Sequence, residues 1–155
     1  MTTTYTLIEK ITVGAAGASS VTFTSIPQTY TDLKIVCSLR GTRPGFVYQD
    51  VFIEFNSNTA NYSGRYLLGN GSAASSGTLS DRFFLSMPAG TATASTFSNN
   101  EVYIPNYTGS TNKSVSVDEV RENNTTAADA ILRAMLWSNT SAITSIRLAP
   151  QTDSF

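Results

Sequence analysis

Two pairs of carboxylates are the first candidates for chemistry in this sequence. Asp50 and Glu54 stand four positions apart in one alternating run, and Asp118 and Glu122 stand four apart in another. Glycoside hydrolysis uses two carboxyl groups roughly 5–10 Å apart. Four residues of an extended strand span roughly 13 Å. Neither pair is therefore placed by its own strand for this chemistry, and we expect no catalytic residue and no enzyme.

Metal and cofactor chemistry has little support in the residue types. The chain contains no histidine, which is the commonest general base and the commonest zinc ligand. The acidic run 118–122 includes an arginine and alternates between two strand faces, unlike a calcium loop. Cys37 shares a strand face with Leu33, Ile35 and Leu39, so we expect a buried structural thiol. We predict no metal and no cofactor.

Charge and hydropathy argue against two classes of partner. Ten Lys and Arg face eleven Asp and Glu among 155 residues, which gives a net charge of -1. A protein that binds the phosphate backbone needs a basic excess, so we expect no nucleic acid. No apolar run approaches the length of about 18 residues that a membrane span needs, and no secretory signal is visible. We expect no contact with a membrane, and we expect the protein to be made in a cytoplasm.

A row of aromatic side chains is the most informative surface feature. Phe46, Tyr48 and Phe52 share the strand face that carries Asp50 and Glu54. Three interpretations remain open for this row: a second core layer beneath loops, a subunit interface, in which aromatic, Met and Arg residues are enriched, or a platform on which a sugar ring stacks. The predicted partner contacts are Phe46, Tyr48, Phe52, Arg133, Met135 and Trp137.

A sugar platform also needs amides or carboxylates beside an exposed ring. Two polar stretches, 56–64 and 69–81, are rich in Gly and Ser and predict long surface loops around the short segment 65–68. These stretches supply both rings and polar groups. The predicted glycan contacts are Tyr62, Tyr66, Asn70 and Asp81.

The elements that must position these residues are strands. The chain has 22 Thr, 20 Ser and 11 Asn, which favour strands and turns over helices. Two-residue alternation of apolar and polar side chains recurs between Gly, Pro and Asn clusters. We predict strands over 5–13, 20–24, 33–40, 46–55, 82–87, 99–104, 113–121 and 142–148, with 82–87 paired to 99–104.

The segment 126–137 is ambiguous. Thr126 and Asp129 imitate a helix capping box ahead of an Ala-rich run. Read as a strand, the same segment places Ile131, Arg133 and Met135 on one face and is apolar on both faces, as a strand buried on both sides would be. Its neighbours all alternate, so the strand is favoured. The whole chain, 1–155, is predicted to be one all-β domain, a jelly-roll-like sandwich of two antiparallel sheets with nine or ten strands.

Several short runs carry a resemblance to a known group of proteins. The runs are 5–8, 11–14, 23–27, 30–33, 99–107, 136–138 and 143–146. In them the sequence resembles short virion proteins of tailed bacteriophages, notably cyanophages and other aquatic phages. The resemblance spans most of the chain and includes no catalytic signature. It implies a β-sandwich on the exterior of the phage particle, made in the bacterial cytoplasm.

Together these features predict a non-enzymatic virion structural protein. The leading expectation is a capsid decoration, or cement, protein that forms a cyclic homo-oligomer, a trimer, and binds the major capsid protein or other virion proteins. The alternative expectation is a tail-fibre or baseplate module that binds glycan on the host surface.

Overall fold

The computed structural model describes residues 4–124 and 127–155. In these residues there are strands and no helix, and hence none that is long and apolar enough to cross a membrane. The strands are β1 (Val21–Phe23), β2 (Leu33–Leu39), β3 (Tyr48–Phe55), β4 (Tyr62–Gly69), β5 (Ala74–Ser80), β6 (Phe83–Pro88), β7 (Ser98–Ile104), β8 (Lys113–Arg121), β9 (Asp129–Trp137) and β10 (Ile146–Pro150).

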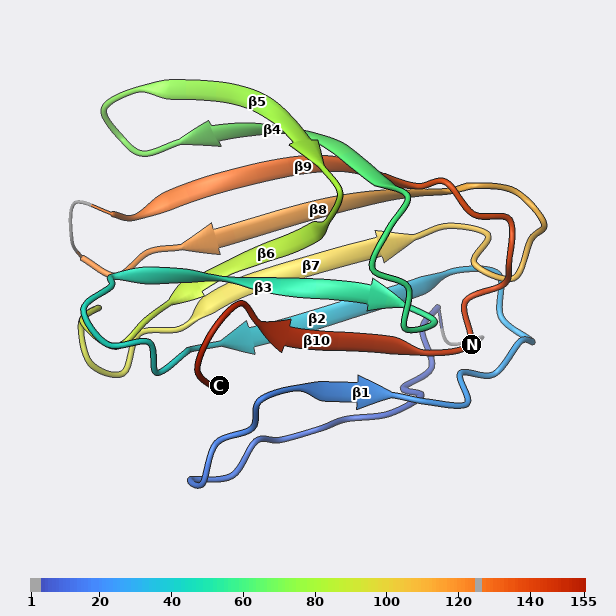
Figure 1. Ribbon diagram of the computed structural model, residues 1–155, viewed down its shortest axis with the longest axis horizontal. Coiled ribbons are helices and arrows are strands. Elements are labelled where there is room, and N and C mark those ends of the chain that lie inside the picture. The colour runs from blue at the N-terminus through green and yellow to red at the C-terminus, as the bar shows by residue number, and fades with distance from the viewer. Residues whose placement is uncertain (1–3, 125–126) are drawn as a thin grey trace.

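The strands form two antiparallel sheets that face each other (Figure 1). One sheet has four strands in the order β1-β10-β3-β6, and the other has six in the order β2-β7-β8-β9-β4-β5. The prediction of an all-β, two-sheet antiparallel sandwich is confirmed. The six-stranded sheet is the wider one, and its β4–β5 hairpin extends to the top of the view in Figure 1.

The core lies between the sheets and is built from the alternating apolar residues. On β3 the side chains of Val51, Ile53 and Phe55 are buried, as the alternation predicts. Phe55 meets Trp137 of β9 edge to face, with 5.5 Å between ring centroids. Such aromatic pairs add to the free energy gained from burial alone. Cys37 is also buried, as predicted.

The ambiguous segment forms strand β9, so the favoured interpretation is confirmed. β9 pairs with β8 from Asp129 to Trp137 and with β4 on its other side, so it satisfies the backbone groups of both neighbouring strands, which a helix would leave unpaired. The proposed cap at Thr126 lies outside the described residues. One expectation for β9 was wrong: the strand is not buried on both faces, because Leu132 is 55% exposed on the outside.

Three further expectations from the sequence were wrong. Residues 5–13 form no strand. The stretches 56–64 and 69–81 are not simply loops, because they contribute most of the β4–β5 hairpin. This hairpin is rich in Ser and Gly, which suit a pair of strands that is largely exposed to solvent. Strands β6 and β7 belong to different sheets: β6 pairs with β3, and β7 pairs with β2 and β8. Alternation shows which residues face inward but not which strands are neighbours.

Candidate functional site

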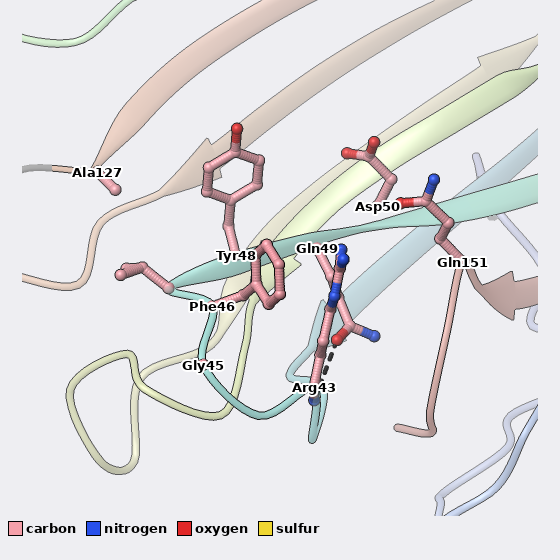
Figure 2. A pocket seen from close by; sticks show the side chains of 9 residues that line it. Arg43, Gly45, Phe46, Tyr48, Gln49, Asp50, Ala127 and Gln151 are labelled. Carbon is pink, nitrogen blue, oxygen red and sulfur yellow. Dashed lines mark hydrogen bonds between the residues drawn. The ribbon is translucent and has the colours of Figure 1, made fainter.

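A depression lies at the end of the sandwich where β3 begins, and it brings an exposed aromatic pair next to polar groups (Figure 2). It has a volume of about 350 Å³. We call it the Tyr48 depression. It is lined by the β3 start and the loop before it, by one residue ahead of β9 and by one after β10: Arg43, Gly45, Phe46, Val47, Tyr48, Gln49, Asp50, Ala127 and Gln151.

Each ring in the Tyr48 depression is supported by an arginine. The guanidinium carbon of Arg43 lies 3.5 Å from the centroid of the Phe46 ring, and that of Arg121 lies 4.0 Å from the Tyr48 ring. A cation over one face of a ring is attracted by its quadrupole and holds the ring in place. Phe46 and Tyr48 are each 48% exposed, so the rings remain available for contact.

Amide and carboxylate groups complete the lining. Gln49 is buried and fixes two loops: its Oε1 accepts a hydrogen bond from Arg43 N at 3.1 Å, and its Nε2 donates to Thr152 O at 3.2 Å. Asp50 accepts a weak hydrogen bond from Ser86 Oγ at 3.4 Å, and burial raises the pKa of its carboxyl group. Gln151 is exposed beside it. Rings beside amides and a carboxylate can bind a hydroxylated ring compound.

A buried ionic network lies behind Asp50 and connects the two sheets. Arg133 of β9 donates from Nη2 to Glu119 Oε1 at 2.7 Å and to Ser86 Oγ at 3.2 Å, while Ser86 N donates to Glu119 Oε2 at 3.3 Å. The structure therefore places Asp50 and Glu119 around one serine, a pairing that strand spacing did not suggest. Glu119 is 0% exposed, so it can neither reach a substrate nor exchange protons freely with solvent. The network is structural.

A second ion pair supports Tyr48. Arg121, the arginine beneath the Tyr48 ring, is paired with Asp129 at the start of β9, and both side chains are almost completely buried. In the described parts of the chain, no three carboxylate or thiol side chains gather in a way that could hold a metal ion.

The predicted partner contacts separate into two groups. Phe46 and Tyr48 lie at the surface, and half-buried Phe52 lies under Arg82, whose guanidinium carbon is 4.5 Å from its ring. The remaining three are buried within the chain. Met135 and Trp137 are 2% and 1% exposed in the core, and Arg133 is held in the ionic network, so we correct the interface assignment for these residues.

The predicted glycan contacts do not form a common site. Tyr62 is buried: its hydroxyl accepts a hydrogen bond from Phe55 N at 2.9 Å and donates to Asn58 O at 3.0 Å, and burial raises its pKa to about 12. Tyr66 is half-buried against Gly77. Asn70 and Asp81 are exposed but lie at opposite ends of β5. A shared platform at these four residues is therefore wrong on geometric grounds.

Several residues of the site were missed by sequence reasoning. Glu119 had a usable signal, because it follows Val115 and Val117 in the inward register of β8, where a charge is unexpected. Arg43 and Gln151 had none. They come from loops about 100 positions apart, and only the packing of β3 against β10 brings them together.

The outer face of the six-stranded sheet holds a second candidate surface. Leu67 and Leu132 are cross-strand partners and are 54% and 55% exposed, and Val120 on β8 is 41% exposed. Small residues surround them, with Asp118 at the margin. We call this surface the outer patch and define it as Leu67, Ala74, Val120, Ala130 and Leu132.

No family model matches the chain, and no match was found among curated proteins or solved structures.

Proposed function

We propose that this chain is a non-enzymatic structural protein of a tailed-phage virion, and specifically a capsid decoration protein that binds the major capsid protein. The observation that carries the proposal is the outer patch. Leu67 and Leu132 are exposed side by side, and neither belongs to the core between the sheets. The sequence resemblance to phage virion proteins supports the same role.

The outer patch has the properties of a docking surface. It lies on a pleated sheet whose neighbouring side chains are mostly Ala, Gly and Ser, so a partner can approach the backbone closely. The central residues are apolar, while Asp118 and Glu101 lie along the same cross-sheet row and supply a polar rim. An apolar centre with a polar rim is the usual anatomy of a protein interface.

Cosedimentation with empty capsids of the encoding phage tests this proposal. The double variant Leu67→Asp with Leu132→Asp should lower capsid binding at least about tenfold, because it places charges at the centre of the interface. Its matched control is Ser80→Asp, which adds a charge near the end of the edge strand β5 and should leave binding unchanged. Unaltered binding of the double variant, or no binding of the wild type, would refute the proposal.

A second candidate function is supported by the Tyr48 depression. We propose host-surface glycan as its ligand, because Phe46 and Tyr48 present half-exposed rings beside Asp50 and Gln151. A ring on an apolar sugar face, with planar polar groups at its edge, is the chemistry that recognises a pyranose. On a glycan array, Tyr48→Ala should abolish binding, whereas Tyr30→Ala, which removes an exposed ring elsewhere, should not.

A further inference from the structure

Residues 4–13 form an extended segment that carries strand-like sequence without strand partners. Tyr5, Leu7, Ile11 and Val13 share one register, which Glu9 interrupts, and Ile8 stands in the other. In the structure Tyr5 is 63% exposed, Leu7 78% and Ile11 39%. Several large apolar side chains that are exposed close together usually mark a surface that binds a partner. The segment therefore carries large apolar side chains, as a strand that packs on a core does, but leaves them exposed to solvent.

The backbone of this segment is equally unpaired. In the described part of the chain, no backbone hydrogen bond involves residues 4–13. The Tyr5 ring lies near β2, with Lys34 Nζ 5.4 Å from the ring centroid. A row of free N–H and C=O groups on an extended chain is suited to pairing with the edge of a sheet.

The segment emerges from a fixed point. A tight turn follows it, in which Gly17 N donates to Gly14 O at 2.9 Å and Gly17 adopts a positive φ of 74°. The residue after the turn is held by the C-terminus, since Phe155 N donates to Ala18 O at 3.0 Å. In Figure 1 this turn lies at the lower left, and the segment runs to it beside β1. The turn is therefore the point at which the segment is attached to the sandwich.

Strand β2 is the best acceptor for such a segment. It is an edge of the six-stranded sheet and is seven residues long, whereas the edge strand β1 has three residues. Its inward residues Ile35 and Leu39 are only partly buried, so the core is incompletely covered along this edge. The other edges suit the segment less well, because β5 is rich in Ser and Gly and β6 ends in a proline.

We propose that residues 5–13 pair as a strand with β2 of a second copy of this chain, and that this exchange closes a cyclic homo-oligomer. Each copy offers one such segment and one such edge, so every subunit donates once and accepts once. A donor surface that differs from its acceptor surface generates a ring when the rotation closes. The side chains of Leu7 and Ile11 then cover the partly open core beside Ile35 and Leu39 of the neighbour. This inference does not depend on the proposed virion role.

A second copy is a better occupant than the segment's own β2. Within the chain the Tyr5 ring lies near Lys34 of β2, and the segment leads from there to the turn that the C-terminus holds beside β1, in the other sheet. Pairing with its own β2 over residues 5–13 would need the residues near this attachment to reach the opposite sheet, whereas a neighbour's β2 carries no such constraint.

Light scattering coupled to size-exclusion chromatography tests the exchange in the purified full chain. The wild type should be an oligomer at micromolar concentration. The double variant Leu7→Asp with Ile11→Asp should be a monomer, and Thr6→Asp with Thr12→Asp, which places the same charges on the opposite register, should keep the oligomer. A monomeric wild type, or an unchanged oligomer in the Leu7 and Ile11 variant, would overturn the proposal.

Hydrogen exchange separates exchange between copies from closure within one chain. Amides of residues 6–12 and of β2 should be protected in the wild type and exposed in the Leu7 and Ile11 variant. Protection of both segments in a monomer would show that the segment closes on its own β2 and would overturn the exchange. If the wild type forms the oligomer but does not bind capsids, the virion role is wrong and the exchange between copies is unaffected.

Discussion

Charged side chains on the inner face of the six-stranded sheet are the distinctive residues of this protein. Lys113, Glu119 and Arg133 are all almost fully buried. Each of these charges has a hydrogen-bond partner. Lys113 Nζ donates to Gly109 O at 2.6 Å in the turn before β8, and Arg133 Nη2 donates to Glu119 Oε1. A buried charge is tolerable only when it is paired or hydrogen-bonded, so these residues fix the geometry around them.

The Cys37 thiol should be unusually unreactive. Burial raises its pKa to about 11. At pH 8 the thiolate fraction is then about one in a thousand, so alkylation of the folded protein should be at least about 100-fold slower than that of the unfolded chain. Timed iodoacetamide labelling followed by mass spectrometry measures this ratio. Equal rates in the presence and absence of denaturant would show that Cys37 is open to solvent.

Asp50 should make stability depend on pH. Because burial raises its pKa in the folded state above the usual 3.8, the native protein holds this proton more tightly than the unfolded chain does. Its contribution is fully present below the unfolded pKa and is lost as pH rises through the folded pKa. Asp50→Asn keeps the acceptor for Ser86 but cannot titrate.

Urea unfolding of the wild type and Asp50→Asn from about pH 3 to about pH 7 tests this expectation. The stability of the variant relative to the wild type should increase with pH. Ser86→Ala leaves the carboxyl group but removes a hydrogen bond that lowers the pKa of Asp50, so it should keep a pH dependence that is displaced toward higher pH. A difference between Asp50→Asn and wild type that stays constant with pH would contradict the buried carboxyl group.

At the scale of elements, one asparagine joins the end of β3 to the segment that enters β10. Asn56 Nδ2 donates to Ala142 O at 2.8 Å, and its Oδ1 accepts from Thr144 N at 2.8 Å and from Ser145 N at 3.2 Å. Asn56 also has a positive φ of 51°, a conformation that asparagine tolerates better than most residues. The side chain therefore substitutes for ladder hydrogen bonds beyond the last strand pair.

Replacing Asn56 should loosen this junction. Asn56 Oδ1 also accepts a hydrogen bond from Thr144 Oγ1 at 3.2 Å, so Asn56→Ala removes four side-chain hydrogen bonds and should cost about 2 kcal/mol in the free energy of unfolding. Asn56→Asp keeps the acceptor and loses only the donor, so it should cost about half as much. Chemical denaturation of the three proteins gives both values. An alanine variant as stable as the wild type would show that water replaces these bonds without loss.

At the scale of the whole molecule, the two sheets share one core and should unfold together. Trp137, the only tryptophan, is 1% exposed and packs against Phe55, which belongs to the opposite sheet. Its emission reports directly on the contact between the sheets. A small domain with one core normally unfolds in a single cooperative transition.

Trp137 emission and far-ultraviolet circular dichroism should therefore follow the same unfolding curve. The native emission should be blue-shifted and insensitive to iodide, because the indole is shielded from solvent. Unfolding of the Leu7 and Ile11 double variant serves as a comparison, since it should change the oligomer without changing the packing of Trp137. Two separated transitions would mean that the sheets are independent cooperative units.

The sequence alone predicted the fold class and most strand positions, because alternation depends only on which side chains avoid water. This is why Val51, Ile53 and Phe55 could be placed in the core. The sequence could not predict that β6 pairs with β3, that residues 5–13 have no strand partner within their own chain, or that Arg43 and Gln151 meet at Tyr48. Those outcomes depend on contacts between residues far apart in the chain, and alternation carries no information about which distant strand or loop becomes a neighbour.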